Sequence, residues 1–357
     1  MAIVINGSGT VTGLSVGGLP DGTVDSGTIA TGTIVDADVA NVAASKLTGA
    51  LPAISGASLT NLPSKGKNLI INGAMRVQQR GTASVTSGYF VDRFQLSGGS
   101  ASAVLTSSTP TEFPTAISVS ATSGNPIVIQ KIESESCQHL SGQTVTASFY
   151  AKNISNATTL YAKLSYAGSV DNFGSSTTIS EQNLGALSGS WVKYTASWTV
   201  PAGGLNGLML NILCAGTSTF TMGVTGVQLE LGSTATDFEH RSYGEELALC
   251  QRYFTTVSKG LFGIATSNTI NFSHNVPVTM RASPTFSLTT SGFRVGDTVA
   301  QGIEFSSATI AANTYSSKEV AVFSVTGSPN SGPSSYRTYL YEPQGSFLAA
   351  VHMSAEL

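Results

Sequence analysis

Two pairs of acidic residues lie close together in this sequence and are candidates for sugar chemistry. Glu133 and Glu135 form one pair, and Asp237 and Glu239 form the other. A glycosidase uses two carboxylates about 5 to 10 Å apart on either side of the bond that it cleaves. Asp237 and Glu239 are also candidates for a calcium site, because calcium takes oxygen ligands.

The same carboxylates have a structural interpretation. Asp237 and Glu239 can pair with Arg93, Arg241 or backbone groups. Asp92 and Arg93, in the run "VDRF", also read as a structural pair. We therefore expect these carboxylates to support the fold and expect no enzymatic activity.

The other reactive side chains are dispersed. The histidines and cysteines lie far apart, with no HxxxH and no CxxC, so we expect no metal site and reduced, mostly buried thiols. "GLSVG" at residues 13–17 has the letters of a nucleophile elbow but lies in a repeat, not at a strand-to-helix turn. No phosphate-binding loop occurs, and no cofactor is expected. The residues concerned are His139, His240, His274 and His352, with Cys137, Cys214 and Cys250.

Composition indicates a β-rich adhesin or fibre. Charged residues make up 10% of the chain, against roughly 25% in an ordinary soluble domain. Glycine is abundant at 38 of 357 residues, and serine and threonine occur throughout. The net charge of -3 provides no basic surface, so we expect no nucleic-acid partner.

Neither a signal peptide nor a membrane span is visible. The start, "MAIVINGSGT", lacks a positively charged region followed by an apolar run. The longest apolar stretch, "GLMLNILCAG", has about half the length that a membrane helix needs. We expect a chain made in a reducing cytosol, without membrane insertion.

Apolar residues recur at every fifth position near the start of the sequence. A step of five turns about 500° on a helix and alternates faces on a strand, so one chain cannot bury this row by itself. Either each pentad makes a turn or neighbouring chains cover the row. A flexible linker and a short pentapeptide solenoid are the alternatives. The residues are Leu14, Leu19, Val24, Ile29, Ile34 and Val39.

The middle of the chain alternates between apolar and polar residues. "TVTASFYAK" places Val145, Ala147, Phe149 and Ala151 on one face. "SWVKYTASWTV" and "VTGVQLELG" alternate in the same way, the first with Trp191 on the opposite face and the second with Gln228 and Glu230 between aliphatic residues. Roughly nine such runs between residues 68 and 239 predict an antiparallel jelly-roll β-sandwich.

Residues 257–357 also read as short strands, and we predict a second small β-sandwich there. The runs are "LFGIAT", "TINFSHNV", "TFSLTT", "EVAVFSV", "YRTYLYE" and "SFLAAVHMSAEL". A Gly/Pro/Asn/Ser-rich turn leads into the fifth run, where aromatic rings and an arginine could hold a sugar by stacking and hydrogen bonds. Ordinary sheet packing of the tyrosines is the alternative. The candidates are Asn330, Tyr336, Arg337, Tyr339 and Tyr341, with Asn313 and Tyr315 as a second group.

Several blocks resemble bacteriophage tail-fibre proteins. "GTIATGTIVDADVA" and "KLTGALPAISGASLTNL" resemble their shaft repeats. "NLIINGAMRVQQRG", "YFVDRFQLS" and "VTGVQLELGSTATDFEHRSYGEELALCQRYF" look like consecutive blocks of one tail-fibre domain, whose sandwich is similar to jelly-roll carbohydrate-binding modules. The resemblance covers about residues 10 to 254 and stops before the last hundred residues. It implies a homotrimer, which supplies the neighbouring chains that the pentads require.

"YGEELALCQRYF", residues 243–254, predicts one short helix. Glu245 and Glu246 lie in its first turn and Arg252 in its last, as the helix dipole favours. About ten residues are marginal alone, so the helix must pack on something. Our hypothesis is the three-fold axis of the trimer, and the alternative is packing on its own sandwich. The expected trimer contacts are Leu247, Cys250, Tyr253 and Phe254 here, and Leu19, Val24, Ile29, Ile34 and Val39 in the shaft.

These observations predict an all-β chain in four parts. Residues 1–64 attach to a tail or baseplate protein and form the shaft, and residues 65–242 form the jelly roll. Residues 243–256 form a helix that connects the jelly roll to the tip, which consists of residues 257–357. The expected function is host recognition within a virion tail, by binding bacterial surface glycan without cleaving it. The alternatives are a polysaccharide depolymerase, a purely structural tail or collar component, and a freestanding carbohydrate-binding protein.

Overall fold

We describe the protein from a computed structural model. It describes residues 4–5, 11–12, 66–81, 85–98, 100–257, 261–266, 268–289, 293–297, 302–305, 307–328, 338–341 and 350–357. The chain divides into two units, Met1–Leu62 and Pro63–Leu357. In the first, β1 (Val4–Ile5) pairs antiparallel with β2 (Val11–Thr12). The pentad residues from Leu14 to Val39, with their proposed trimer contacts, lie outside the described residues.

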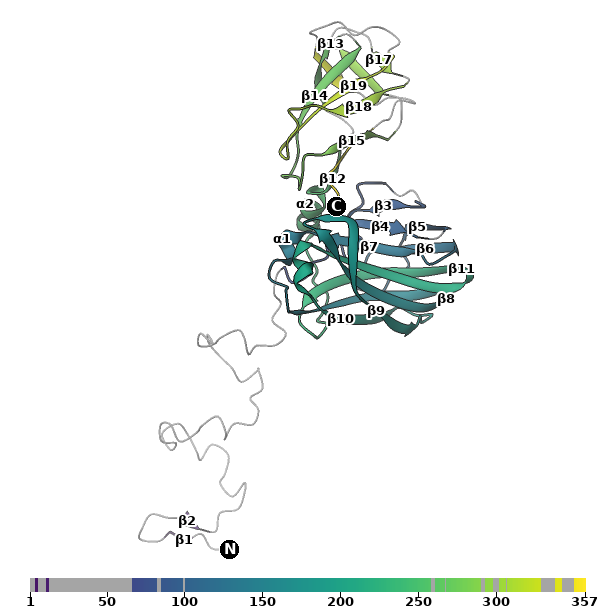
Figure 1. The fold of residues 1–357 in the computed structure, drawn as a ribbon, viewed down its shortest axis with the longest axis vertical. Helices are drawn as coiled ribbons and strands as arrows, with labels where there is room; N and C mark the ends of the chain where they lie inside the picture. Colours follow the sequence, from purple (N-terminus) through teal and green to yellow (C-terminus); the bar gives the residue numbers. More distant parts are fainter. Residues whose placement is uncertain are drawn as a thin grey trace. The chain divides into compact units, whose positions relative to one another are not determined.

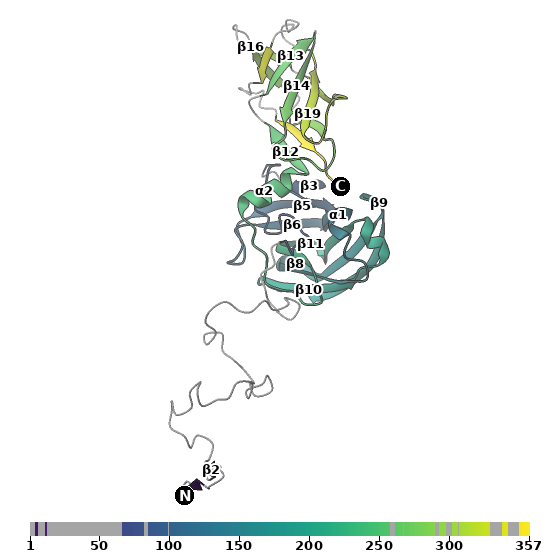
Figure 2. The same cartoon turned by 90° about the vertical axis from the view of Figure 1, so that its left-hand side faces the viewer.

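Nine strands of the second unit form one antiparallel hydrogen-bonded network, and the predicted β-sandwich is confirmed. β8 and β11 are its two longest strands and run side by side along most of their length (Figures 1 and 2). The strands are β3 (Gly88–Val91), β4 (Phe94–Ser97), β5 (Ser100–Thr106), β6 (Ala116–Ser123), β7 (Ile127–Ile132), β8 (Thr144–Ser169), β9 (Asn172–Ala186), β10 (Val192–Thr199) and β11 (Leu208–Leu231).

The two layers of the sandwich share β8 and β11. Along one half of this pair, β7 flanks β11 and β9 flanks β8; along the other half, β6 flanks β11 and β10 flanks β8. The register of the pair shifts between Ala215 and Thr221 and again between Thr225 and Gln228. Such bulges bend strands. The two halves can therefore face each other, and the Trp198 indole N–H donates to the Ser180 carbonyl at 3.1 Å from β10 to β9.

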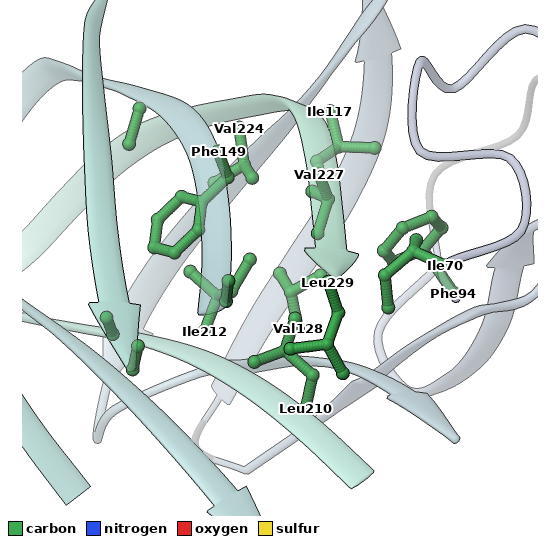
Figure 3. Packing of buried hydrophobic residues seen from close by; sticks show 14 of the residues in the cluster. Ile70, Phe94, Ile117, Val128, Phe149, Leu210, Ile212, Val224, Val227 and Leu229 are labelled. Atoms are coloured by element: carbon green, nitrogen blue, oxygen red, sulfur yellow. The ribbon is translucent and has the colours of Figure 1, made fainter. Parts of the chain in front are cut away.

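The core lies between these halves. Val145, Ala147, Phe149 and Ala151 are fully buried, as their alternation predicts. Gln228 and Glu230 of β11 are also buried, at 0% and 3% exposure, although the alternation places them toward solvent. Figure 3 shows part of this core, with side chains from Ile70, Phe94, Ile117, Val128, Phe149, Leu210, Ile212, Val224, Val227 and Leu229.

The burial of Gln228 and Glu230 has a specific cause. Residues 232–241 fold across the outer side of β11 and supply polar partners. The Thr236 backbone N–H and hydroxyl donate to the Glu230 carboxylate at 2.8 and 2.6 Å. Gln228 donates to Glu230 at 2.9 Å and accepts from the Glu239 N–H at 2.9 Å. Residues 232–241 therefore cover the outer side of β11 and bury its polar side chains.

The predicted helix is confirmed as α2, Tyr243–Gln251. A reciprocal capping box begins it: the Ser242 hydroxyl accepts from the Glu245 N–H at 3.2 Å, and the Glu245 carboxylate accepts from the Ser242 N–H at 3.0 Å. α2 packs on its own sandwich, where the Glu246 carboxylate accepts hydrogen bonds from the Asn72 N–H and from Arg241. Two shorter helical segments are α1 (Ser134–Cys137) and the 3-10 turn η4 (Ala202–Asn206).

The first and last segments of the sandwich are joined to each other. The Glu239 carboxylate accepts from the backbone N–H groups of Gly66 and Asn68. The Arg241 guanidinium donates to the carbonyls of Asn68 and Ile70. With the contact between Asn72 and Glu246, these bonds connect residues 66–72 directly to residues 239–246.

The remaining strands form two antiparallel sheets around a second core, which includes Phe272, Phe293, Phe305 and Phe323. All six predicted strand runs contain strands. The three-stranded sheet consists of β12 (Phe254–Val257), β21 (Val351–Ser354) and β15 (Thr285–Leu288). The seven-stranded sheet consists of β17 (Gly302–Phe305), β16 (Phe293–Asp297), β20 (Thr338–Tyr341), β13 (Phe262–Thr266), β14 (Thr269–Asn275), β19 (Val320–Thr326) and β18 (Thr309–Ala312). The predicted boundaries after residues 242 and 256 stay predictions.

Glu356 joins the residues after β21 to the sandwich. Its carboxylate pairs with Arg80 at 2.7 Å and with Arg93, whose side chain is 1% exposed. The Arg93 guanidinium also lies 3.5 Å from the centre of the Tyr253 ring. The predicted pairing of Arg93 with Asp92 is wrong, because Arg93 points to a residue 263 positions away in the sequence.

Asp92 has other partners. Its carboxylate accepts from the Gln79 backbone N–H at 2.6 Å and from the Gln79 side-chain amide at 3.1 Å. The residue is 0% exposed. Burial raises the pKa of this carboxyl to about 6 from an ordinary value of 3.8, despite the hydrogen bonds from Gln79, which act in the opposite direction. Between about pH 4 and 6, the folded protein therefore keeps this carboxyl protonated to a greater extent than the unfolded chain does.

Asp92 should make stability fall as pH rises from 4 to 6. The folded chain binds a proton there that the unfolded chain has lost, so ionisation of the buried carboxyl costs up to about 3 kcal/mol by pH 7. We expect urea unfolding at pH 4, 5, 6 and 7 to show this change as a difference between wild type and Asp92→Asn. A constant difference between the two proteins across these pH values would contradict the assignment.

Candidate functional site

The predicted acidic pairs hold the fold together. Glu133 is 5% exposed and pairs with Arg252 at 2.8 Å, while Glu135, 83% exposed, lies 3.4 Å from the same arginine. Glu133 also lies 3.8 Å from Arg281. These contacts connect the start of α1 with the end of α2, and the two carboxylates face an arginine instead of an open cleft.

In the second acidic pair, the carboxylate of Glu239 has a similar role. The Glu239 carboxylate accepts from two backbone N–H groups and lies 3.4 Å from Arg241, which confirms the structural interpretation for this residue. The backbone carbonyl of Asp237 accepts from Lys67 at 2.8 Å. The donors around Glu239 take up the oxygens that a calcium ion would use. Within the described ranges, no three His, Cys, Asp or Glu side chains group as metal ligands.

Most of the predicted sugar site in the C-terminal part lies outside the described residues. This holds for Asn330, Tyr336 and Arg337. The backbones of Tyr339 and Tyr341 belong to β20, opposite Gly263 and Val295 respectively, and their side chains are not among those described. Their role in binding stays a prediction.

The second predicted group forms one turn. The Asn313 side-chain oxygen accepts from the Tyr315 N–H at 3.2 Å, and the Tyr315 side chain is 81% exposed. The structure therefore brings these two residues together and presents the tyrosine ring to solvent.

The predicted trimer contacts of the helix are engaged within their own chain. Cys250, Tyr253 and Phe254 are 0%, 3% and 1% exposed, and Leu247 is half-buried. Burial raises the pKa of Tyr253 and of the Cys250 thiol above their ordinary values. Contact between chains at these positions stays a prediction. Leu247 is the member of this group whose side chain is partly exposed.

A surface on the outer side of the sandwich has no counterpart among the predicted site residues. It is formed where β10, β8, β11 and β6 lie side by side (Figure 2). Gly223 of β11 pairs with Lys152 of β8 on one side and with Ser118 of β6 on the other. Trp191 precedes β10 and reaches over Gly223. We call Trp191, Gly223, Lys152 and Ser118 the Trp191 face.

The indole of Trp191 lies directly on Gly223. A Cβ atom at residue 223 would come within 2.6 Å of Cη2 and 3.1 Å of Cζ2 of this ring. A side chain at residue 223 would therefore displace the ring from the sheet. Trp191 is half-buried, so part of the ring remains accessible.

Hydrogen-bonding groups lie on the same side of these strands as this ring. The Ser120 and Thr221 hydroxyls, which pair across β6 and β11, lie 3.0 Å apart. Neither the Trp191 indole N–H nor the Lys152 ammonium donates to another residue in the described ranges. The face thus combines an aromatic ring, hydroxyls and two available donors.

Tyr150 and the segment that covers Gln228 border the face. The Tyr150 hydroxyl donates to the Glu112 carboxylate at 3.0 Å, and burial followed by this hydrogen bond raises the pKa of the phenol. Beside it, Lys193 donates to the Thr236 carbonyl at 2.7 Å. A glycine within a strand often marks a close approach, and Gly223, one of three glycines in β11, was the signal in the sequence that could have identified this face.

Comparisons with known proteins leave the family open. No protein-family model matches the chain, and no curated protein matches it. None of the helices in the described ranges has both the length and the apolar composition that a bilayer-spanning helix requires.

Among solved structures, the chain is similar over parts of its length to three proteins of different origin. The enzymatically active domain of bacteriophage CBA120 tailspike protein 4 is 15% identical, with a TM-score of 0.34, over 46% of this chain and 22% of that one. TmCBM61 in complex with β-1,4-galactotriose is 12% identical, with a TM-score of 0.32, over 46% and 99%. The CBM22-1 xylan-binding domain of Paenibacillus barcinonensis Xyn10C is 13% identical, with a TM-score of 0.32, over 47% and 96%. At these values no activity or ligand is carried over to this chain.

Proposed function

We propose that this chain is a phage tail-fibre subunit that binds a surface polysaccharide of its host without cleaving it, and that the Trp191 face takes part in binding. The observation that carries the proposal is the close packing of the Trp191 indole on Gly223, on a face that also carries hydroxyls and available donors. Sugar rings present apolar C–H faces, which stack on aromatic rings, and hydroxyls, which exchange hydrogen bonds with groups at the rim.

The fibre part of the proposal rests on the resemblance of residues 10–254 to tail-fibre blocks. In this proposal, residues 1–64 attach to a tail or baseplate protein and form a shaft in a homotrimer. A single open sugar site binds weakly, but three on one particle can gain a factor of about 10² to 10⁴ in avidity. The location in a virion tail follows from the same resemblance.

Binding without hydrolysis is supported by the roles of the acidic residues. Glu133 pairs with Arg252, Glu239 accepts backbone N–H groups, and Glu230 accepts from Thr236. Each of these carboxylates is therefore committed to the fold. A depolymerase would release oligosaccharides from the polysaccharide, and a purely structural tail component would bind none.

Trp191→Ala should weaken polysaccharide binding roughly tenfold, the equivalent of about 1.4 kcal/mol of stacking. The experiment uses the full chain, whose native mass by light scattering should be three times 36.6 kDa. Binding to polysaccharide extracted from the host is then measured by biolayer interferometry, and released oligosaccharides are assayed in the same samples.

Phe262→Ala is the matched control, since it removes an exposed ring from the C-terminal part. It should leave binding unchanged. Loss of binding in this variant, with full binding by Trp191→Ala, would move the site away from the Trp191 face. A monomeric mass would restrict the proposal to a single-chain glycan-binding protein.

A further inference from the structure

An open depression of about 360 Å³ lies between the end of α2 and the turn that follows β14. It is separate from the Trp191 face and from the acidic pairs. One side is formed by the last residue of α2 and by β12, and the other by the end of β14 and the residues after it. The lining includes Gln251, Thr255 and Thr256 on the first side, and His274, Asn275 and Pro277 on the second.

The polar side chains here are available for a ligand. Among the described residues, the side chains of Gln251, Thr256, His274 and Asn275 make no hydrogen bond to another protein group. Gln251, Thr256 and His274 are partly buried, where polar groups are usually paired within a protein, and Asn275 is exposed. Four unused side chains that converge on one depression therefore provide a ready set of donors and acceptors.

The described residues of the lining carry no charge near neutral pH. None of them is Asp, Glu, Lys or Arg. His274 is half-buried, and burial lowers the pKa of its imidazole below the ordinary 6.5, so the ring is neutral. Among these described residues, an anionic ligand would find no cation, and a cationic ligand would find no carboxylate.

The chemistry of the lining fits a neutral polyol. Amides, hydroxyls and a neutral imidazole each combine donor and acceptor capacity, as sugar hydroxyls do. Pro277 adds a rigid apolar surface suited to a C–H face. The volume lies near the lower end of the range of about 300 to 1,000 Å³ for small-molecule sites, so it suits one or two sugar rings.

We infer that this depression is a second sugar subsite, for an uncharged pyranose unit of the polysaccharide. The inference rests on the proposed glycan-binding function for its choice of ligand, but not on the Trp191 face. It assigns Gln251, His274 and Asn275 as hydrogen-bonding groups and Pro277 as the apolar contact. A polysaccharide with neutral units along its chain can then be held at two places on each subunit.

Histidine NMR on the full chain tests the subsite directly. The chain has four histidines, and His139 and His240 are exposed and do not line the depression. With ¹³C-labelled histidine, glucose, galactose or N-acetylglucosamine at about 50 mM should give a saturable shift of the His274 ring signals, since open sites bind sugars with Kd near the millimolar range. Glucuronate should give a much smaller shift.

Paired variants make the test specific. Asn275→Ala should weaken the affinity that the His274 shift reports by about tenfold, the worth of one hydrogen bond. Asn268→Ala, at an exposed asparagine away from the depression, should leave it unchanged. Absence of a His274 shift with all three neutral sugars, or an equal shift of His139, would overturn the subsite. An equal response to glucuronate would overturn the assignment to uncharged units.

The same spectra separate this inference from the proposed function. A normal His274 response in Trp191→Ala supports a subsite independent of the Trp191 face, even if that variant keeps full polysaccharide binding and the Trp191 proposal fails. If Trp191→Ala loses polysaccharide binding while wild-type His274 never responds, the proposed function stands and the subsite is overturned.

Discussion

Replacing Glu356 with alanine is expected to lower the free energy of unfolding by about 3 to 5 kcal/mol. The carboxylate is 7% exposed and pairs with Arg80 and with the almost fully buried Arg93. Without it, the Arg93 guanidinium keeps its charge, because the pKa of arginine is far above neutrality. The fold must then hold an uncompensated cation against the Tyr253 ring. Urea unfolding followed by tryptophan fluorescence measures the change.

Glu135→Ala is the matched control for this prediction. It removes a carboxylate that is 83% exposed and lies 3.4 Å from a partly exposed arginine. Exposed ion pairs contribute about 0 to 1 kcal/mol, so stability should change little. Equal effects of the two substitutions would mean that Glu356 does not compensate a buried charge. The double variant with Arg93→Met should recover part of the loss, since it removes the stranded cation.

Gly73→Ala is expected to destabilise the sandwich by about 3 to 4 kcal/mol. A Cβ atom at this residue would lie 2.0 Å from the Val227 carbonyl oxygen, which is a backbone atom of β11. The same two residues share a hydrogen bond from the Val227 N–H to the Gly73 carbonyl at 2.9 Å. Relief of the clash therefore requires the two backbones to separate. Thermal unfolding of wild type and variant measures the loss.

Gly244→Ala provides the opposite expectation for the same chemical change. No atom lies within 4 Å of a Cβ at this position, which is in the first turn of α2. Alanine is the better helix former, so stability should rise by about 0.5 to 1 kcal/mol. A similar loss in both variants would show that the close approach at Gly73 is not the cause.

Local patterns predicted the strands because one face of each is buried and the other is not. The alternation from Val145 to Ala151 gave the correct inward face, and the charges of residues 243–252 gave the helix. Alternation failed at Gln228 and Glu230. There the outer side of β11 is covered by residues 232–241. An alternation with a period of two shows which residues share a face of the strand, but it does not show that a later segment of the chain folds over that face.

Long-range partners were the second limit of prediction. Arg93 follows Asp92 in the sequence, but its charge is neutralised by Glu356. The Trp191 face draws its residues from β8, β11, β6 and the position just before β10, and only the register of the strands brings them together. Deleting residues 257–357 would also remove Glu356 from Arg93, so point variants test the binding surfaces more cleanly than truncation.

The bonds between residues 66–72 and residues 239–246 have a mechanical consequence. A pulling force applied across the two ends of the sandwich would act first on the Glu239 contacts with Gly66 and Asn68, and on the Arg241 contacts with Asn68 and Ile70. The tension would therefore pass through this short bridge of polar contacts between the two segments, and strands β3 to β11 would not carry it. As long as this bridge holds, the surfaces carried by those strands keep their shape under load.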